Sequence, residues 1–224
     1  MSPRAIPPVE SYLLPGESDL PANIAPWSVD ASRAALLVHD MQRFFLRVFP
    51  DTPKRALVDN CAQLRDRCRR LGVPIAYTAQ PGSMTPSQRG LLNVFWGPGM
   101  SGDATDRALV PELEAGPGEK MITKWRYSAF HASDLHTWML ENGRDQLMVC
   151  GVYAHIGVLA TAQDSFSRDI ETFLVADAVA DFSARHHWSA MEHAAQNCAT
   201  VTTTAQAVAE LDATASRVLA HGRP

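Results

Sequence analysis

The chain has 224 residues, 46% of them hydrophobic and 20% charged, a composition typical of a globular protein with a substantial core. Its formal net charge of −4 excludes the strongly basic surface of nucleic-acid-binding proteins and the polybasic patch of proteins that bind membrane surfaces. No signal peptide is recognisable, and no apolar stretch approaches the roughly 20 residues of a membrane-spanning helix. We therefore expect a cytoplasmic protein with no nucleic-acid or membrane partner.

The first 33 residues differ from the rest of the chain. They contain many prolines and few periodic apolar positions, which predicts an extended arm, either packed on the domain or partly disordered. Residues 34–224 show no internal repeat and no linker, so we predict a single domain there. The first apolar run, residues 34–40, is continuous and ends in Asp40, as expected for a strand buried on both faces.

Apolar runs and helical patterns then alternate along the domain. The predicted strands are 34–40, 74–80, 121–124, 146–152, 172–180 and 200–208, the last running into a final helix. The predicted helices between them are 54–72, 133–143, 155–169 and 186–199, with Ser133 as the N-cap of the second. This alternation predicts an α/β fold in which helices cover both faces of a parallel sheet. Residues 81–120 lack a clear strand, and loops of that length often form functional lids.

Polar side chains follow several of the predicted strands. Asp40 ends the first strand, Gln80 the second and Lys124 the third, and Tyr153 follows the fourth. Ligands bind at the carboxyl ends of the strands in open α/β sheets, so these four residues predict one shared site. Taken singly, each has a simpler explanation, because an Asp after a strand is usually a turn former or helix cap and a Lys is usually solvated.

Other chemical features of the sequence predict little. Asp177 and Asp181 at the end of the fifth strand are best interpreted as capping or structural hydrogen-bonding residues. The adjacent His186 and His187 point in different directions on a helix, so we predict no metal site. No glycine-rich nucleotide-binding motif occurs, and we predict no cofactor. Four cysteines without CxxC spacing, Cys61, Cys68, Cys150 and Cys198, are interpreted as reduced and mostly buried thiols.

Several longer motifs resemble those of one enzyme family. The strings LLVHDMQRFF (36–45), KWRYSAFHASDL (124–135), GVYAHIGV (151–158) and FLVADAVADFS (173–183) resemble the isochorismatase family over nearly the whole chain. Residues 79–100 are most similar to the phenazine-pathway branch, whose substrate is 2-amino-2-deoxyisochorismate. The resemblance implies a three-layer fold around a six-stranded parallel sheet, a small-molecule substrate derived from chorismate, and a homodimer.

The resemblance also concerns Gly157. In the amidases of the same superfamily an Asp, a Lys and a Cys form a triad, and the Cys would fall at Gly157 here. Enzymes of the isochorismatase type lack that Cys and keep the Asp and Lys, as this chain keeps Asp40 and Lys124. The metal-binding residues of the nicotinamidases have no counterpart. Gly157 is thus expected to leave room for substrate and water, although it could merely permit a tight turn.

The implied reaction does not need a nucleophile. Protonation of the methylene carbon of an enolpyruvyl ether creates an oxocarbenium ion, which water captures, so a positioned general acid suffices. We predict Asp40 as that acid, and Lys124 as a group that orients Asp40 or binds a substrate carboxylate. The resemblance places four residues around the polar groups of the substrate: Gln80, Arg89, Tyr127 and Tyr153. Phe44 and Trp96 are expected to be apolar walls.

Alternatives to this interpretation are open at this point. The same chemistry on isochorismate would serve siderophore biosynthesis, although some siderophore enzymes carry an additional carrier domain that this chain lacks. Arg89 could be a surface charge of the lid, and Phe44 and Trp96 could be core aromatics. The scaffold could also be a non-catalytic binding protein, which the presence of both Asp40 and Lys124 disfavours. A displaced thiol such as Cys150 could act as a nucleophile, but it lies inside a predicted strand.

Overall fold

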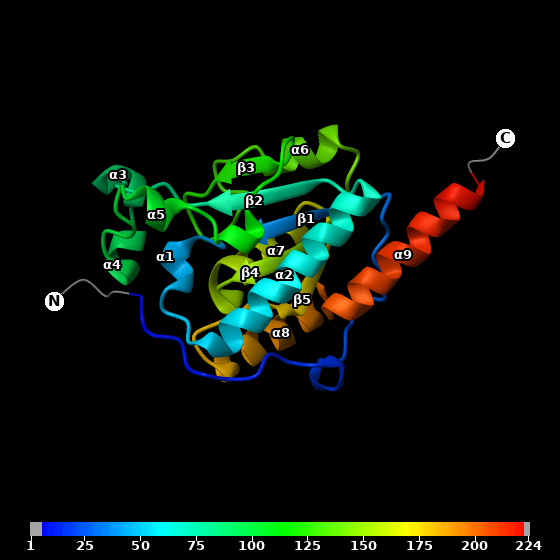
Figure 1. Ribbon diagram of the computed structural model, residues 1–224, viewed down its shortest axis with the longest axis horizontal. Coiled ribbons are helices and arrows are strands. Elements are labelled where there is room, and N and C mark those ends of the chain that lie inside the picture. The colour runs from blue at the N-terminus through cyan, green and yellow to red at the C-terminus, as the bar shows by residue number, and fades with distance from the viewer. Residues whose placement is uncertain (1–5, 222–224) are drawn as a thin grey trace.

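The computed structural model describes the backbone of residues 6–221 and the side chains of residues 6–216. A six-stranded, all-parallel sheet forms its centre, with the strand order β3-β2-β1-β4-β5-β6 (Figure 1). The strands are β1 (Ala34–His39), β2 (Ile75–Ala79), β3 (Lys120–Thr123), β4 (Gln146–Val152), β5 (Glu171–Ala180) and β6 (Thr200–Thr202). The predicted α/β fold class and the parallel sheet are confirmed.

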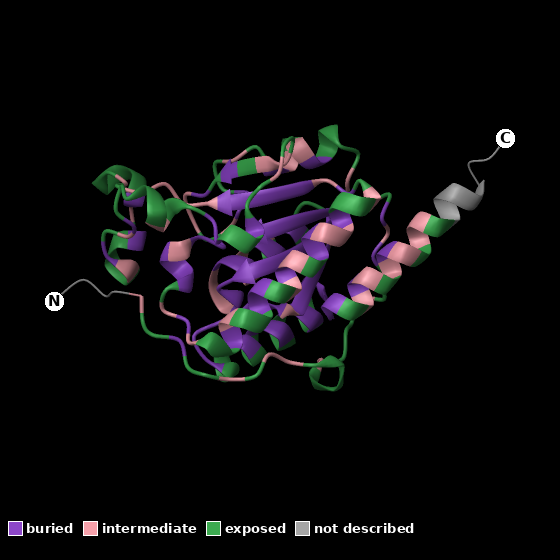
Figure 2. Ribbon diagram, in the orientation of Figure 1, coloured by how far each residue is buried: buried purple, intermediate pink, exposed green. Residues whose placement is uncertain are grey.

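Helices cover the sheet on both faces. One face carries α2 (Asp51–Leu71) and α9 (Thr204–His221), and the other carries α6 (Leu135–Glu141), α7 (Leu159–Phe166) and α8 (Ala184–Asn197). Successive residues of β1 point to opposite faces of the sheet. Leu36 packs in the apolar cluster beneath α2, and Leu37 packs in the cluster beneath α6, α7 and α8. Every residue of β1 and β4 is buried, which explains why both read as continuous apolar runs (Figure 2).

Several element boundaries differ from the predicted ones; β1 and β2, for example, each end one residue early, so Asp40 and Gln80 follow their strands. Strand β3 lies one residue earlier than predicted, so Lys124 follows the strand instead of ending it. Strand β6 ends at Thr202, and α9 begins at Thr204. The helix predicted from residue 155 begins as a π-helical segment, η3 (Ala154–Val158). The N-cap of α6 is Asp134, not Ser133, and its side chain makes no capping bond because it pairs with Lys120 instead.

The N-terminal arm lies along the domain. Residues 6–33 contain one short helix, η1 (Glu17–Asp19), no strand, a bend at 24–25 and a turn at 31–33. The Val9 N–H donates to the Val48 carbonyl at 3.1 Å and the Glu10 N–H to the Phe182 carbonyl at 2.8 Å. These bonds attach the arm to the end of the sheet where the strands terminate.

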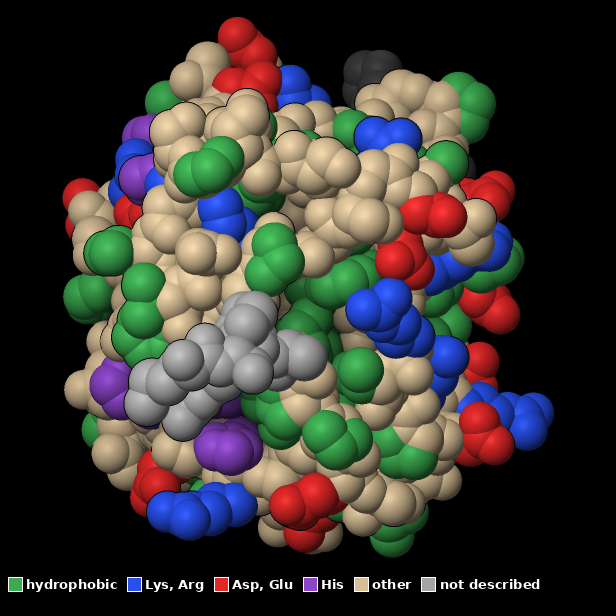
Figure 3. All heavy atoms as spheres, turned by 90° about the vertical axis from the view of Figure 1, so that its left-hand side faces the viewer, with side chains coloured by type: hydrophobic (Ala, Val, Ile, Leu, Met, Phe, Trp, Pro, Cys, Tyr) green, Lys and Arg blue, Asp and Glu red, His purple; other side chains and the backbone are tan. Residues whose placement is uncertain are grey.

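The long segment between β2 and β3 is built from short helices. It contains α3 (Pro86–Arg89), α4 (Leu92–Trp96), α5 (Ala104–Arg107) and η2 (Pro111–Leu113), and α5 contacts the small helix α1 (Arg43–Leu46). Figure 1 shows α3, α4 and α5 beyond the carboxyl ends of the strands. Figure 3 views the molecule from this side, and hydrophobic side chains lie around the middle of the face. Among the described residues, no helix is both long and apolar enough to cross a membrane.

Candidate active site

A cavity lies at the carboxyl ends of β1, β2 and β4. It encloses about 560 Å³ of space, its open mouth included. The strand order reverses between β1 and β4, and ligands of open α/β sheets bind at such a point. All nine predicted site residues line this cavity: Asp40, Phe44, Gln80, Arg89, Trp96, Lys124, Tyr127, Tyr153 and Gly157. The structure therefore brings the predicted residues together, and their roles stay predictions.

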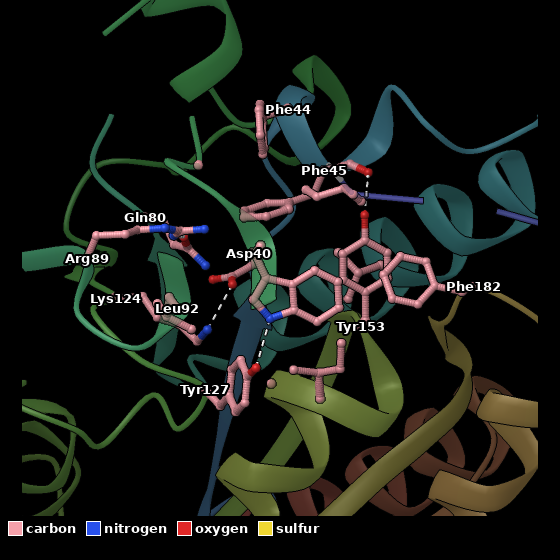
Figure 4. A pocket seen from close by; sticks show the side chains of 16 residues that line it. Asp40, Phe44, Phe45, Gln80, Arg89, Leu92, Lys124, Tyr127, Tyr153 and Phe182 are labelled. Atoms are coloured by element: carbon pink, nitrogen blue, oxygen red, sulfur yellow. Dashed lines mark hydrogen bonds and ion pairs between the residues drawn. The ribbon is translucent and has the colours of Figure 1, made fainter. Parts of the chain in front are cut away.

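Asp40 lies on the floor of the cavity, immediately after β1. Its backbone has a φ of 52°, a left-handed conformation that Asp tolerates better than most residues. The Asp40 N–H donates to Thr78 Oγ1 at 2.9 Å, and the Thr78 hydroxyl donates to Asp40 Oδ1 at 2.5 Å. Two hydrogen bonds with one hydroxyl thus fix both the turn and the carboxylate, which points into the cavity (Figure 4).

Lys124 is the charged partner of Asp40. Its N–H donates to the Ala79 carbonyl at 2.9 Å, which fixes the backbone just beyond β3. Its Nζ donates to Asp40 Oδ2 at 2.9 Å, and both side chains are almost completely buried. Burial by itself would raise the pKa of the Asp40 carboxyl group, but the Lys124 ammonium group and the hydrogen bond from Thr78 hold that pKa below its ordinary value. Asp40 is therefore ionised while the cavity contains no substrate.

Arg89 is the second cation of the cavity. Its side chain is only 6% exposed, so the alternative of a solvated lid charge is wrong. The guanidinium donates to the Gly97 carbonyl at 2.9 Å and to Gln80 Oε1 at 3.3 Å, and burial lowers the pKa of Arg89. Within the described chain it contacts no carboxylate. Burying a guanidinium without a counter-ion costs free energy, and a bound carboxylate would supply the missing negative charge.

Gln80 is held in place through its backbone. The Gln80 N–H donates to Gln42 Oε1 at 2.8 Å, and Gln42 Nε2 donates to the Gln80 carbonyl at 3.0 Å. This pair of bonds connects the end of β2 to the start of α1. The Gln80 side-chain amide NH₂ has no partner in the described structure and is free to donate to a ligand.

Aromatic rings form the opposite wall of the cavity. The Tyr153 ring stacks on Phe182 with 4.3 Å between the ring centroids, and Trp96 stacks on the same Phe182 at 6.0 Å. The Tyr153 hydroxyl donates to the Phe45 carbonyl at 3.0 Å, so Tyr153 presents its ring, not its hydroxyl hydrogen, to a ligand. Tyr127 Oη accepts a hydrogen bond from Trp96 Nε1 at 2.8 Å, which leaves the Tyr127 hydroxyl hydrogen free (Figure 4).

Several further residues of the site were not predicted. Ile6 of the arm, Phe45, Leu92, Gly99, Val152, Ile156 and Phe182 also line the cavity. Thr78 and His39 lie behind it, and each is a polar residue inside a buried strand run, a signal that could have singled them out. Nothing in the local sequence could have placed Ile6 there, because its position depends on the path of the whole arm.

The other polar candidates have structural roles. Asp177 accepts hydrogen bonds from the N–H and hydroxyl of Thr204, and thus caps the start of α9. Asp181 accepts from the backbone and ring of His155. All four cysteines are buried free thiols, as predicted, and Cys150 inside β4 does not line the cavity. Among the side chains of residues 6–216, no three His, Cys, Asp or Glu gather as a metal-binding group.

Comparisons with known proteins agree on one family. The model of the isochorismatase domain matches residues 34–206. The chain is 57% identical over 203 residues to the phenazine biosynthesis protein PhzD of Pseudomonas fluorescens, covering 91% of this chain and 98% of that protein. It is 46% identical over 197 residues to the isochorismatase of Bacillus subtilis, covering 87% of this chain and 63% of that protein. A cysteine hydrolase structure from Pseudomonas syringae pv. phaseolicola shares the fold, with a TM-score of 0.75, 20% identity, and coverage of 87% of this chain and 98% of that one.

Proposed function

This chain belongs to the isochorismatase family, and we propose that it hydrolyses the enolpyruvyl ether of 2-amino-2-deoxyisochorismate. The products are pyruvate and trans-2,3-dihydro-3-hydroxyanthranilate. The observation that carries this proposal is the buried Asp40–Lys124 pair on the floor of a cavity whose described lining contains no Cys or Ser. Such a site holds an acid and a cation but no nucleophile.

The reaction proceeds by proton transfer. The Asp40 carboxylic acid gives its proton to the methylene carbon of the enolpyruvyl group, and the C=C electron pair forms the new C–H bond. The resulting oxocarbenium ion is captured by water, whose lost proton returns to the Asp40 carboxylate. The hemiketal then collapses: its hydroxyl group gives up a proton and becomes the carbonyl of pyruvate, the bond to the ring oxygen breaks, and this oxygen takes up a proton. Pyruvate and the ring alcohol leave.

The charges of the site support a substrate with two carboxylates. Arg89 is a buried cation without a carboxylate partner in the described structure, and Lys124 is a second cation nearby. One substrate carboxylate would pair with Arg89 and the other would approach Lys124. As the substrate competes for Lys124, the pKa of Asp40 rises and the carboxyl group takes up the proton that it donates. The apolar wall excludes water from the charged groups.

The choice of the amino substrate over isochorismate follows from sequence similarity. The chain is 57% and 58% identical to two proteins named for phenazine biosynthesis and 42% identical to a component of enterobactin synthase, whereas the name isochorismatase occurs at both 57% and 46% identity. The substrates differ by an amino group in place of a hydroxyl group. A homodimer, which the family resemblance implies, is also a proposal, and light scattering of the purified protein tests it. A cytoplasmic location is proposed because all four cysteines are free thiols.

The direct test is pyruvate release, followed with a coupled lactate dehydrogenase assay. The purified protein is given 2-amino-2-deoxyisochorismate and isochorismate in parallel, without added metal. A higher kcat/KM for the amino substrate is expected. A higher kcat/KM for isochorismate would instead indicate the isochorismatase reaction of siderophore biosynthesis. No pyruvate from either compound would overturn the enzymatic function and favour a binding protein on this scaffold.

A further inference from the structure

Gly157 faces a side chain that leaves no room for a larger residue. A β-carbon built on Gly157 would lie 2.4 Å from Cε1 and 3.0 Å from Nε2 of His39, and 3.3 Å from Nζ of Lys124. The first of these distances is well inside the contact distance of two carbon atoms. The backbone itself would accept a side chain, since Gly157 lies in η3 and is not among the residues with positive φ. The obstacle is therefore the imidazole ring of His39.

The His39 ring cannot move aside easily. It is completely buried, and its Nδ1–H donates to the Val152 carbonyl at 2.8 Å. The backbone of His39 is equally confined, because a β-carbon on the neighbouring Gly151 would lie 2.1 Å from the His39 carbonyl oxygen. Strands β1 and β4 thus approach closely at this pair of residues, and the ring is fixed at both ends.

His39 is a neutral imidazole at this position. Burial lowers the pKa of His39 to about 4, with the Lys124 charge acting in the same direction. Since Nδ1 carries the hydrogen that is donated to Val152, Nε2 carries a lone pair, and this buried atom has no hydrogen-bond partner among the described residues. The ring contributes volume beside Asp40 and Lys124 without adding a charge to their ion pair.

We propose that His39 is a positioning residue whose ring occupies the space that a side chain at position 157 would need. Because no nucleophilic side chain can then lie beside Lys124, the Asp40–Lys124 pair acts in acid catalysis. A thiol at position 157 would place a nucleophile beside Lys124, and the volume of His39 forbids it. The residue pair 39 and 157 therefore decides between two chemistries on one scaffold. The proposal uses the hydrolase activity of the proposed function as one readout, and two further readouts do not depend on that activity.

The first test is a double-mutant cycle of Gly157→Ala and His39→Asn. Asn retains an N–H that can donate to the Val152 carbonyl, but it lacks the Cε1 and Nε2 atoms that meet position 157. In the wild-type background, Gly157→Ala is expected to lower kcat/KM by about tenfold or more and to lower the melting temperature. In the His39→Asn background, the same substitution should change kcat/KM by less than about threefold and should not lower the melting temperature. Gly16→Ala, whose β-carbon meets only an Asp19 oxygen at 3.7 Å, controls for the substitution itself.

Equal losses in both backgrounds, in activity and in melting temperature, would overturn the proposal. If Gly157→Ala does not fold with His39 present, recovery of folding in the double variant supports the proposal, and failure to recover overturns it. The melting temperatures give this answer even for a protein that turns out to hydrolyse neither substrate. A failure of the proposed function is thus distinguished from a failure of the coupling between residues 39 and 157.

The second test introduces the thiol itself. The four native cysteines are buried, and burial raises the pKa of the Cys61, Cys68 and Cys198 thiols, so the wild-type protein should react slowly with iodoacetamide. Gly157→Cys combined with His39→Asn should alkylate at least about tenfold faster at pH 7 than the wild type, because Lys124 stabilises the thiolate. The labelled residue is identified by peptide mass. The proposal would be overturned if the single variant Gly157→Cys, with His39 present, has an unchanged melting temperature and is labelled at residue 157 as fast as the double variant. The His39 ring would then not exclude a side chain from this position.

Discussion

The carboxylate of Asp40 and the ammonium group of Lys124 lie 2.9 Å apart, and neither is reached by solvent to more than a few per cent of its surface. In the proposed reaction, the general acid is therefore held as an ion pair before the substrate binds. Lys124 lowers the pKa of Asp40, and in the proposed mechanism the carboxylate takes up a proton only when an anionic substrate competes for Lys124. Binding and proton uptake are then one event, and this coupling has measurable consequences.

Replacement of Asp40 by Asn tests the acid. The amide has nearly the same shape but no acidic proton, so kcat should fall by about 100-fold or more, the contribution typical of a general acid. Substrate affinity should stay equal or increase, because a negative charge has been removed from an anion-binding site. Steady-state pyruvate release and equilibrium binding measure the two effects. The exposed Asp59→Asn serves as control, and an Asp40→Asn rate within about tenfold of the wild type would exclude Asp40 as the acid.

The value of kcat/KM should decrease steadily as the pH rises. The pKa of Asp40 in the free protein lies below its ordinary value, so the carboxyl group is ionised across the neutral range. Since kcat/KM reports the free enzyme and the reaction needs the protonated form, kcat/KM should fall about tenfold per pH unit between roughly pH 5.5 and 7.5. A profile of kcat/KM across this range checks the slope. A flat profile would mean that no proton is taken up on the way to the transition state.

Replacement of Arg89 by Met should separate binding from stability. Loss of the guanidinium removes the partner of a substrate carboxylate, and kcat/KM should fall by about 30-fold or more. The free energy of unfolding should stay the same or rise by about 1 kcal/mol, because a buried cation without a carboxylate partner in the described chain has been removed. Activity assays and urea unfolding measure both. Arg107→Met, on the exposed surface of α5, should leave kcat/KM unchanged, and a strongly destabilised Arg89→Met would show that Arg89 is mainly structural.

The stability of the protein should decrease towards acidic pH through two buried histidines. Burial lowers the pKa of both His39 and His187 to about 4, whereas the unfolded value is about 6.5. Between these pH values the unfolded chain binds more protons than the folded protein. The free energy of unfolding therefore increases as the pH rises through this window and decreases as the pH falls. At pH 5 the loss should be about 2 kcal/mol per histidine relative to pH 7.

Urea unfolding at pH 7 and pH 5 measures this loss. The variants His39→Asn and His187→Asn should each reduce the difference between the two pH values, and the double variant should reduce it further. A wild-type free energy of unfolding that is the same at both pH values would contradict the assignment of neutral, buried rings to these two positions.

The fold could be predicted well from the sequence because its strands are buried on both faces. Strands β1 and β4 are continuous apolar runs, and the positions where they end predicted that Asp40 lies at the carboxyl-terminal edge of the sheet. The boundaries of β3 and α6 were less accurate, because β3 is short and partly exposed and the side chain of Asp134 is engaged by Lys120. Local patterns do not report such competing contacts.

The site was predicted by two kinds of argument with different reach. Strand ends indicated Asp40, Gln80, Lys124 and Tyr153, whereas Arg89 and Trp96 came from family resemblance, since nothing periodic marks the segment between β2 and β3. Tyr153 was expected near the polar groups of the substrate; it lines the cavity, but its hydroxyl donates to the Phe45 carbonyl. The steric relation between His39 and Gly157 joins residues more than a hundred positions apart, and the sequence contains no local trace of it.

The path of the N-terminal arm limits how the protein can be handled as a fusion partner. Ile6 lines the cavity, and Tyr12 is anchored where its hydroxyl accepts the Asp181 N–H at 2.8 Å. An affinity tag or carrier protein attached ahead of Ile6 would be tethered within a few residues of the site. Figure 1 shows α9 extending away from α3, α4 and α5, so a label or surface linker attached after this helix would lie far from the cavity.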